Sequence, residues 1–222
     1  MHPARTTRAC RGRPGERGSL ASLRAARDDG QARLSLELYL ARHGETEWSL
    51  SGRHTGTTDP PLTANGEQKA RALSGRLAEI RFDQVFSSPL QRAIRTASLA
   101  GFEKPEVTEL LREVDYGRYE GLTTTQIHET DPDWELYRDG SPDGETPAQV
   151  YRRAQEFIDL ATTRTGQGRV LAFAHGHILR AVAVAWIRAD ITVAAGLQLD
   201  VATLNILRDG ERGRVIALWN AV

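Results

Sequence analysis

The sequence lacks several features that would point to particular classes of protein. Its single cysteine, Cys10, cannot form a disulfide within the chain, which is compatible with a reducing cytoplasm. No segment approaches the roughly 20 consecutive apolar residues of a membrane-spanning helix. The 29 basic and 29 acidic residues balance, so the chain has no overall basic field of the kind that attracts nucleic acid. We therefore expect a globular cytoplasmic protein that binds neither membranes nor nucleic acid.

Residues 1–34 differ in composition from the rest of the chain. They contain eight arginines against three acidic residues, and no continuous apolar stretch. Such a segment buries too little apolar surface to fold, so we expect a disordered Arg-rich extension, or a start codon placed too far upstream. Organellar targeting is the alternative, because targeting peptides are also Arg-rich and poor in acidic residues. Residues 35–222 contain no long linker, which predicts a single domain.

Strand-like and helix-like segments alternate within residues 35–222. Residues 34–41, 83–88 and 169–175 have the length and apolar content of buried strands. Two segments between them carry apolar residues at helical spacing: Ala70, Leu73, Leu77 and Ile80, and then Val150, Ala154, Phe157, Ile158 and Ala161. This alternation predicts an α/β fold, a three-layer sandwich with a mostly parallel sheet and helices on both faces. Residues 202–210 and 214–220 predict a C-terminal hairpin added to it.

Cationic side chains follow three of the predicted strands. Arg42 and His43 end the first strand, and His175 ends the third. Arg92 lies just after the second strand, on a helix whose first turn we expect to contain Pro89. Because ligands of open α/β sheets bind beyond the carboxyl ends of the strands, we expect these groups to share one crevice.

Three other cationic residues have simpler interpretations. Histidine is only intermediate in its preference for burial, and we interpret His54 and His128 as hydrogen-bonding surface residues. Arg95 is equally compatible with the crevice and with a solvated helix face.

The clustered groups suit phosphoryl transfer through a phosphohistidine. A neutral imidazole is a nucleophile near its ordinary pKa of about 6.5 if its other ring nitrogen is held as a donor, and His43 would attack phosphorus. Arg42, Arg92 and His175 would supply fixed positive charge for the phosphoryl oxygens. The leaving alkoxide also needs a proton. An acid must therefore lie near the ester oxygen, kept protonated by the anion beside it.

Four stretches carry a resemblance to a known family: "LARHGETEWSLSGRHTGTTDPPLT", "SSPLQRAIRTA", "LLREVDYGRYEG" and "FAHGH". In order and spacing they resemble the histidine phosphatase superfamily, which includes the cofactor-dependent phosphoglycerate mutases, over about residues 36–187. The resemblance implies that residues 35–222 are one domain of this family. It implies His43 as the phosphorylated nucleophile, Glu113 as the proton donor, and Arg42, Arg92 and His175 around the phosphate. The implied substrate contacts are Arg42, Ser49, Thr55, Gly56, Arg92, Glu113, Tyr116, Gly176 and His177.

Departures from the mutase pattern favour the phosphatase branch of the family. The mutases have Asn at the positions of Ser49 and His177, and a long basic insertion after the acid that grips the substrate carboxylate. The interval 114–174 has no comparable insertion, and the adjacent Arg152 and Arg153 fall inside a predicted helix. The sequence is more similar to small bacterial acid phosphatases and to the yeast-type sedoheptulose bisphosphatase. We therefore predict hydrolysis of small phosphorylated metabolites, with sugar phosphates as candidates.

Several alternatives stay open. Mutase activity is one, and a non-catalytic phosphate-binding module is another, although such a module would need no acid at Glu113. His43, His175 and His177 could also be metal ligands. However, Arg42 would repel a dication, and no second carboxylate accompanies the H-x-H pair. We therefore expect no metal and no cofactor. The sequence gives no indication of oligomeric state.

Overall fold

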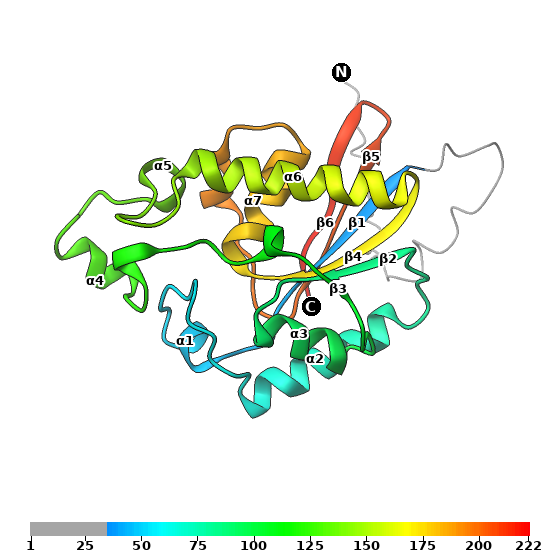
Figure 1. The fold of residues 1–222 in the computed structure, drawn as a ribbon, viewed down its shortest axis with the longest axis horizontal. Coiled ribbons are helices and arrows are strands. Elements are labelled where there is room, and N and C mark those ends of the chain that lie inside the picture. Colours follow the sequence, from blue (N-terminus) through cyan, green and yellow to red (C-terminus); the bar gives the residue numbers. More distant parts are fainter. Residues whose placement is uncertain (1–34) are drawn as a thin grey trace, which may run out of the picture. The chain divides into compact units, whose positions relative to one another are not determined.

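The computed structural model describes residues 35–222, and the extension expected at residues 1–34 lies outside this part of the chain and stays a prediction. The described residues contain one six-stranded sheet with the order β3-β2-β4-β1-β5-β6 (Figure 1). The strands are β1 (Leu36–Arg42), β2 (Gln84–Ser87), β3 (Glu106–Val107), β4 (Gly168–Ala174), β5 (Leu204–Gly210) and β6 (Gly213–Ala221). β3, β2, β4 and β1 run parallel, β5 pairs antiparallel with β1, and β6 with β5. The predicted mostly parallel sheet with a C-terminal hairpin is confirmed.

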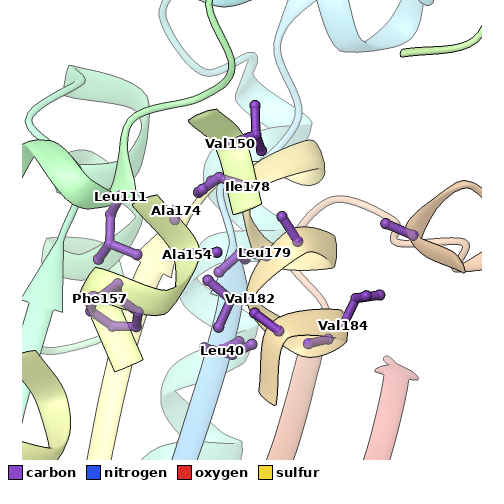
Figure 2. Packing of buried hydrophobic residues seen from close by; sticks show 14 of the residues in the cluster. Leu40, Leu111, Val150, Ala154, Phe157, Ala174, Ile178, Leu179, Val182 and Val184 are labelled. Carbon is purple, nitrogen blue, oxygen red and sulfur yellow. The ribbon is translucent and has the colours of Figure 1, made fainter. Parts of the chain in front are cut away.

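Helices cover both faces of the sheet, as the alternation predicts. α2 (Ala64–Leu77) and α3 (Gln91–Leu99) lie on one face, and α6 (Pro147–Thr165) and α7 (Gly176–Trp186) lie on the other (Figure 1). Successive side chains of a strand point to opposite faces. Leu38 and Leu40 of β1 therefore pack in the α6/α7 core, shown in Figure 2, whereas Tyr39 and Ala41 pack in the α2/α3 core. Burial on both faces explains why these strands read as continuous apolar runs.

The helical spacing identifies α6 correctly and overextends α2. The five apolar residues singled out in the α6 segment are all buried. α2 ends at Leu77, and the Ile80 N–H bonds back to the Leu77 carbonyl in a turn. Ile80 still packs against the α2/α3 core, so its position in the apolar pattern reflects its packing and not a continuation of the helix.

The expected place of Pro89 is wrong by a few residues. α3 begins at Gln91, with Leu90 as its N-cap, so Pro89 precedes the helix. Leu90 has no side-chain acceptor for the first free N–H groups, and Asp59 supplies one from another segment by accepting the Gln91 N–H at 2.6 Å. Because this cap comes from a residue distant in sequence, the local pattern could not reveal where the helix starts.

Shorter elements complete the structure. They are the helices α1 (Glu47–Leu50), α4 (Thr124–His128) and α5 (Leu136–Asp139), and the 3-10 turns η2 (Glu109–Leu111), η3 (Gly117–Tyr119) and η4 (Ile191–Gly196). Within residues 35–222, no helix combines the length and the apolar character needed to cross a bilayer.

Candidate active site

His43 lies directly after β1, where its N–H extends the ladder to the Ala174 carbonyl of β4 at 2.9 Å. Its Nδ1 is 2.7 Å from the Gly44 carbonyl oxygen. A carbonyl oxygen can only accept, so Nδ1 carries the proton and Nε2 has a free lone pair. Burial, together with Arg42 and Arg92, holds the pKa of His43 well below its usual value. His43 is therefore neutral at physiological pH, with the tautomer that a nucleophile requires.

Arg42 places an unpartnered donor beside His43. Its Nη1 donates to the Leu199 carbonyl, while its buried Nε finds no acceptor among residues 35–222. Gly176 leaves room for the guanidinium, since a Cβ at that position would lie 3.3 Å from Arg42 Cζ. A buried donor without an acceptor is costly, and an anion in this position would satisfy it.

Arg92 and His175 form a buried pair behind His43. Arg92 Nε donates to His175 Nδ1 at 3.1 Å, so the proton of His175 sits on Nε2, which is 2.7 Å from Ser88 Oγ. The His175 ring centre lies 5.2 Å from that of His43. Burial and Arg92 hold the pKa of His175 well below its usual value. In the free enzyme His175 is therefore neutral, contrary to the expectation that it supplies positive charge, and the fixed charges are those of Arg42 and Arg92.

Arg92 is itself held by main-chain acceptors. Its two Nη atoms donate to the carbonyls of Thr58 at 2.8 Å and Thr55 at 2.9 Å, and Nη1 pairs with Asp59 Oδ1 at 3.2 Å. These bonds tie the loop that contains Thr55 to the start of α3.

A pocket of about 340 Å³ includes His43 in its wall. Of the residues predicted for the site, it is lined by Arg42, His43, Ser49, Thr55, Glu113, Tyr116 and His177. The residues not predicted are Gly52, Arg53, His54, Thr124 and Arg180. Two larger cavities, of about 510 and 490 Å³, contain none of the predicted site residues. The smaller pocket is therefore the candidate active site.

Four of the predicted site residues are absent from the pocket wall. They are Gly56, Arg92, His175 and Gly176. Gly56 donates its N–H to the Glu120 carboxylate at 2.9 Å, and a Cβ there would lie only 2.4 Å from the Val114 carbonyl oxygen. Its glycine is therefore explained by a close approach of two loops. Ser49 does line the pocket, but its hydroxyl already closes a capping box with Thr46 at the start of α1.

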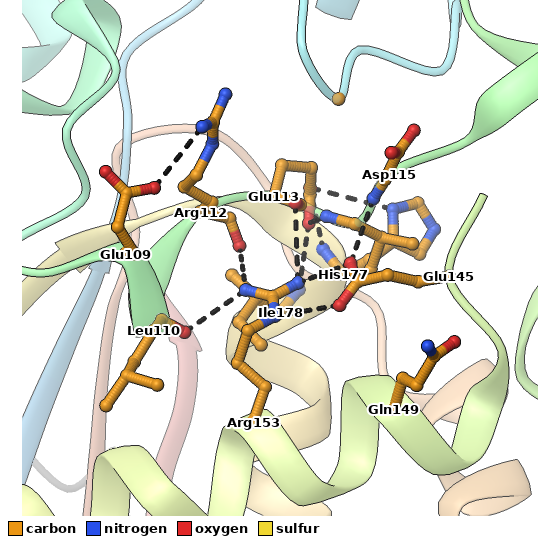
Figure 3. Close-up of polar contacts among 12 residues, drawn as sticks. Glu109, Leu110, Arg112, Glu113, Asp115, Glu145, Gln149, Arg153, His177 and Ile178 are labelled. Atoms are coloured by element: carbon orange, nitrogen blue, oxygen red, sulfur yellow. Dashed lines mark hydrogen bonds and ion pairs between the residues drawn. The ribbon is translucent and has the colours of Figure 1, made fainter.

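Glu113 reaches the N-terminus of α7 from the loop after η2 (Figure 3). Its Oε2 accepts the His177 N–H at 3.0 Å, and its Oε1 accepts the N–H groups of Ile178 at 2.9 Å and Val114 at 3.0 Å. Burial alone would raise the pKa of Glu113, but the three N–H donors, one of which is the main chain of His177, favour the ionised form and hold the pKa well below the usual range. The free enzyme therefore holds a carboxylate here, and the protonated acid expected from the sequence belongs to the state in which a phosphate anion lies beside it.

His177 and Tyr116 line the pocket together with Glu113. Tyr116 OH lies 2.5 Å from His177 Nδ1, and Tyr137 OH donates to the His177 carbonyl at 2.9 Å. Burial and the nearby Arg180 lower the pKa of His177 to about 3. His177 is therefore neutral at physiological pH.

The interpretation of His54 as a surface residue is wrong. Its ring lies 4.8 Å from that of Tyr116 and 5.3 Å from that of Trp134, and burial lowers its pKa to about 4. The only signal in the sequence is that His54 directly precedes Thr55, which lies in the same loop and was predicted for the site.

Two of the simpler interpretations are confirmed. His128 is exposed and its Nε2 lies 3.0 Å from the Trp134 carbonyl oxygen. Arg95 lies on a solvated helix face and pairs with Glu67 at 2.8 Å. Between residues 35 and 222, no group of three or more His, Cys, Asp or Glu side chains is arranged to hold a metal ion.

Comparisons with known proteins agree with this geometry. The histidine phosphatase superfamily (branch 1) matches residues 38–222. An acid phosphatase of Mycobacterium tuberculosis is 43% identical over 171 residues, which cover 76% of this chain and 84% of that protein. Sedoheptulose 1,7-bisphosphatase of Saccharomyces cerevisiae is 36% identical over 180 residues, 66% of each chain. A solved structure from M. tuberculosis superposes with a TM-score of 0.81 at 40% identity and covers 84% of this chain and 97% of the other. The chain therefore belongs to branch 1 of the histidine phosphatase superfamily and is a phosphatase.

Proposed function

We propose that this phosphatase hydrolyses phosphomonoesters of small metabolites through a phosphohistidine on His43 Nε2. The observation that carries the proposal is the bond from His43 Nδ1 to the Gly44 carbonyl. It leaves Nε2 unprotonated in a pocket whose wall also includes Arg42, and the Arg42 Nε has no acceptor among the described residues. A nucleophile and an anion-binding donor thus occupy the same wall, as attack on a phosphoryl group requires.

In the first step, the P–N bond to His43 forms as the P–O bond to the leaving alcohol breaks. Arg42 stabilises the charge on the phosphoryl oxygens by direct contact, and the buried Arg92 adds its field from behind. A monoester monoanion brings its own proton into the site. Glu113, held as a carboxylate, can relay that proton to the leaving oxygen.

In the second step, water attacks the phosphohistidine. Glu113 accepts a proton from the water, the electron pair of the P–N bond returns to His43 Nε2, and inorganic phosphate leaves. The same carboxylate therefore serves as donor in one step and acceptor in the other. A low pKa in the free enzyme suits the second role directly.

The pocket favours small anionic substrates. Arg42, Arg53 and Arg180 line it, against the single carboxylate of Glu113. Its volume of about 340 Å³ suits a phosphoryl group with a small organic remainder. The names of the two relatives, an acid phosphatase and a sugar bisphosphatase, support sugar phosphates as the first compounds to test. The single cysteine and this class of substrate support action in the cytoplasm.

The direct test is phosphate release from a panel of phosphomonoesters, including sugar bisphosphates and 3-phosphoglycerate. We expect inorganic phosphate as the product, because the chain lacks the basic insertion with which mutases retain a phosphoglycerate. Interconversion of 2- and 3-phosphoglycerate that is faster than phosphate release would contradict hydrolysis as the main reaction.

A further inference from the structure

Arg153 reaches the loop of Glu113 from α6, although the sequence suggests only a helix-face residue. Its Nη1 donates to the carbonyls of Leu110 at 3.1 Å and Arg112 at 2.6 Å, and its Nη2 lies 3.4 Å from the Glu113 carbonyl oxygen (Figure 3). One guanidinium thus contacts three main-chain oxygens on the approach to the proposed acid. Arg153 is not part of the pocket wall.

Glu145 extends this attachment to the other side of Glu113. Arg153 holds Glu145 through two bonds, from Nε at 2.9 Å and from Nη2 at 2.6 Å. The Glu145 carboxylate accepts the Asp115 N–H at 3.0 Å, and the Glu145 N–H donates to the Asp115 carbonyl at 2.9 Å. A Cβ at Gly144 would lie 2.3 Å from the Asp115 carbonyl oxygen, so the two loops pack backbone to backbone.

Different helices therefore hold the main chain around Glu113 and its side-chain carboxylate. The Arg153–Glu145 pair on and before α6 fixes its main chain, and the N-terminus of α7 fixes its carboxylate. The carboxylate must lie within hydrogen-bond reach of the ester oxygen to transfer a proton, and small displacements are costly to such a step.

We infer that Arg153 and Glu145 are positioning residues that place Glu113 for proton transfer to the leaving group. This inference rests on the proposed role of Glu113. If the pair were only structural, its loss should slow the reaction of all esters alike. If the pair positions Glu113, its loss should slow the reaction of esters whose leaving group must be protonated more than the reaction of other esters. The requirement for the acid is large for an alkyl phosphate and small for 4-nitrophenyl phosphate.

The test measures single-turnover phosphorylation of the enzyme by both substrates. The Arg153→Met substitution should lower the rate of phosphorylation by the alkyl ester roughly 10- to 100-fold, because the acid is misplaced. The rate with 4-nitrophenyl phosphate should fall much less. Arg153→Lys keeps the charge but not the forked donors, and its loss should be smaller and of the same pattern. Glu145→Gln should show the same selectivity. Arg152→Met, which changes the exposed neighbour on the same helix, is the matched control and should behave as the parent.

Equal losses with both substrates in Arg153→Met and Arg153→Lys would overturn the positioning role, as would activity equal to that of Arg152→Met. If Arg153→Met fails to fold in a thermal melt, Arg153→Lys and Glu145→Gln decide the question. Glu113→Gln separates this inference from the proposed function. If Glu113→Gln shows no dependence on the leaving group, the acid role itself is wrong. If it does and the Arg153 variants do not, only the positioning role is wrong.

Discussion

The two halves of the proposed active site, one for the phosphate and one for the acid, are built in different ways. In the phosphate half, Arg42, His43 and His175 sit at the ends of the neighbouring strands β1 and β4, and Arg92 follows β2. The hydrogen-bond ladder of the sheet sets their spacing. In the acid half, Glu113 lies on a loop whose place depends on side chains from α6 and on the N-terminus of α7. The phosphate half should therefore be sensitive mainly to which groups are present, and the acid half also to where they lie.

The largest effect is expected when the nucleophile of the phosphate half is removed. His43→Ala should abolish hydrolysis of any ester, including 4-nitrophenyl phosphate, because the variant lacks the nitrogen that accepts the phosphoryl group in the proposed mechanism. The parent should yield a trapped phosphoenzyme with acid-labile, base-stable phosphate on His43. His128→Ala, at an exposed histidine, is the control and should keep full activity. Label on serine, or on His175 alone, would refute the assignment.

Removing the acid should have a large effect that depends on the substrate. Glu113→Gln cannot transfer a proton, and it should slow phosphorylation by an alkyl phosphate by roughly 10²–10⁴-fold. An aryl phosphate with a good leaving group should lose much less. Glu109→Gln, at an exposed carboxylate close by in sequence, provides the comparison and should leave both rates unchanged. Similar losses for the two esters would remove Glu113 from the acid role.

The dependence on pH should separate the two halves again. His43 must be neutral to attack, and its lowered pKa keeps it so until the pH falls well below its usual value, so the acid limb of kcat/KM should lie below about 6.5. Glu113 is already ionised there, and the proton must enter with the substrate monoanion. The alkaline limb should therefore follow the second pKa of the ester, about 6 for alkyl phosphates. Profiles for esters with different second pKa values test this. If the alkaline limb instead lies at the same pH for all of these esters, the proton comes from a group on the enzyme.

Asp59, which supports Arg92 in the phosphate half, should not show the leaving-group dependence expected of the Arg153–Glu145 pair. Asp59 pairs with Arg92 and accepts N–H groups at the start of α3. Asp59→Asn should lower kcat/KM by about tenfold or less, because a partly exposed partner adds little to an ion pair, and by the same factor for alkyl and aryl esters. Asp83→Asn is the control, because Asp83 accepts the Arg169 N–H near the opposite end of β4. A selective loss with the alkyl ester would mean that the two halves are not separable.

No effect is expected from removing metal ions. Arginines supply the positive charge of the pocket, so dialysis against EDTA should leave turnover unchanged. Vanadate should inhibit, because it mimics five-coordinate phosphorus. Activity that is lost on chelation and restored by zinc would instead support metal ligation by His175 and His177.

The sequence by itself determines the fold and most of the phosphate half. Apolar runs and helical spacing specify which segments are strands and helices, and parallel strands bring their carboxyl ends to one edge. Arg42, His43 and Arg92 could therefore be grouped from their places after strands alone. The resemblance adds Glu113 and Tyr116, which lie on loops where no such rule applies.

Only the tertiary structure decides the electrostatic state of these groups and their supports. The neutral His175, the ionised Glu113 and the buried His54 depend on burial and on donors from distant segments, which the local pattern does not contain. The same holds for Asp59 as the cap of α3 and for Arg153 beneath the loop of Glu113. Periodicity reports which face of an element is buried, whereas pKa values and hydrogen-bond partners are set by whatever other elements bring to that face.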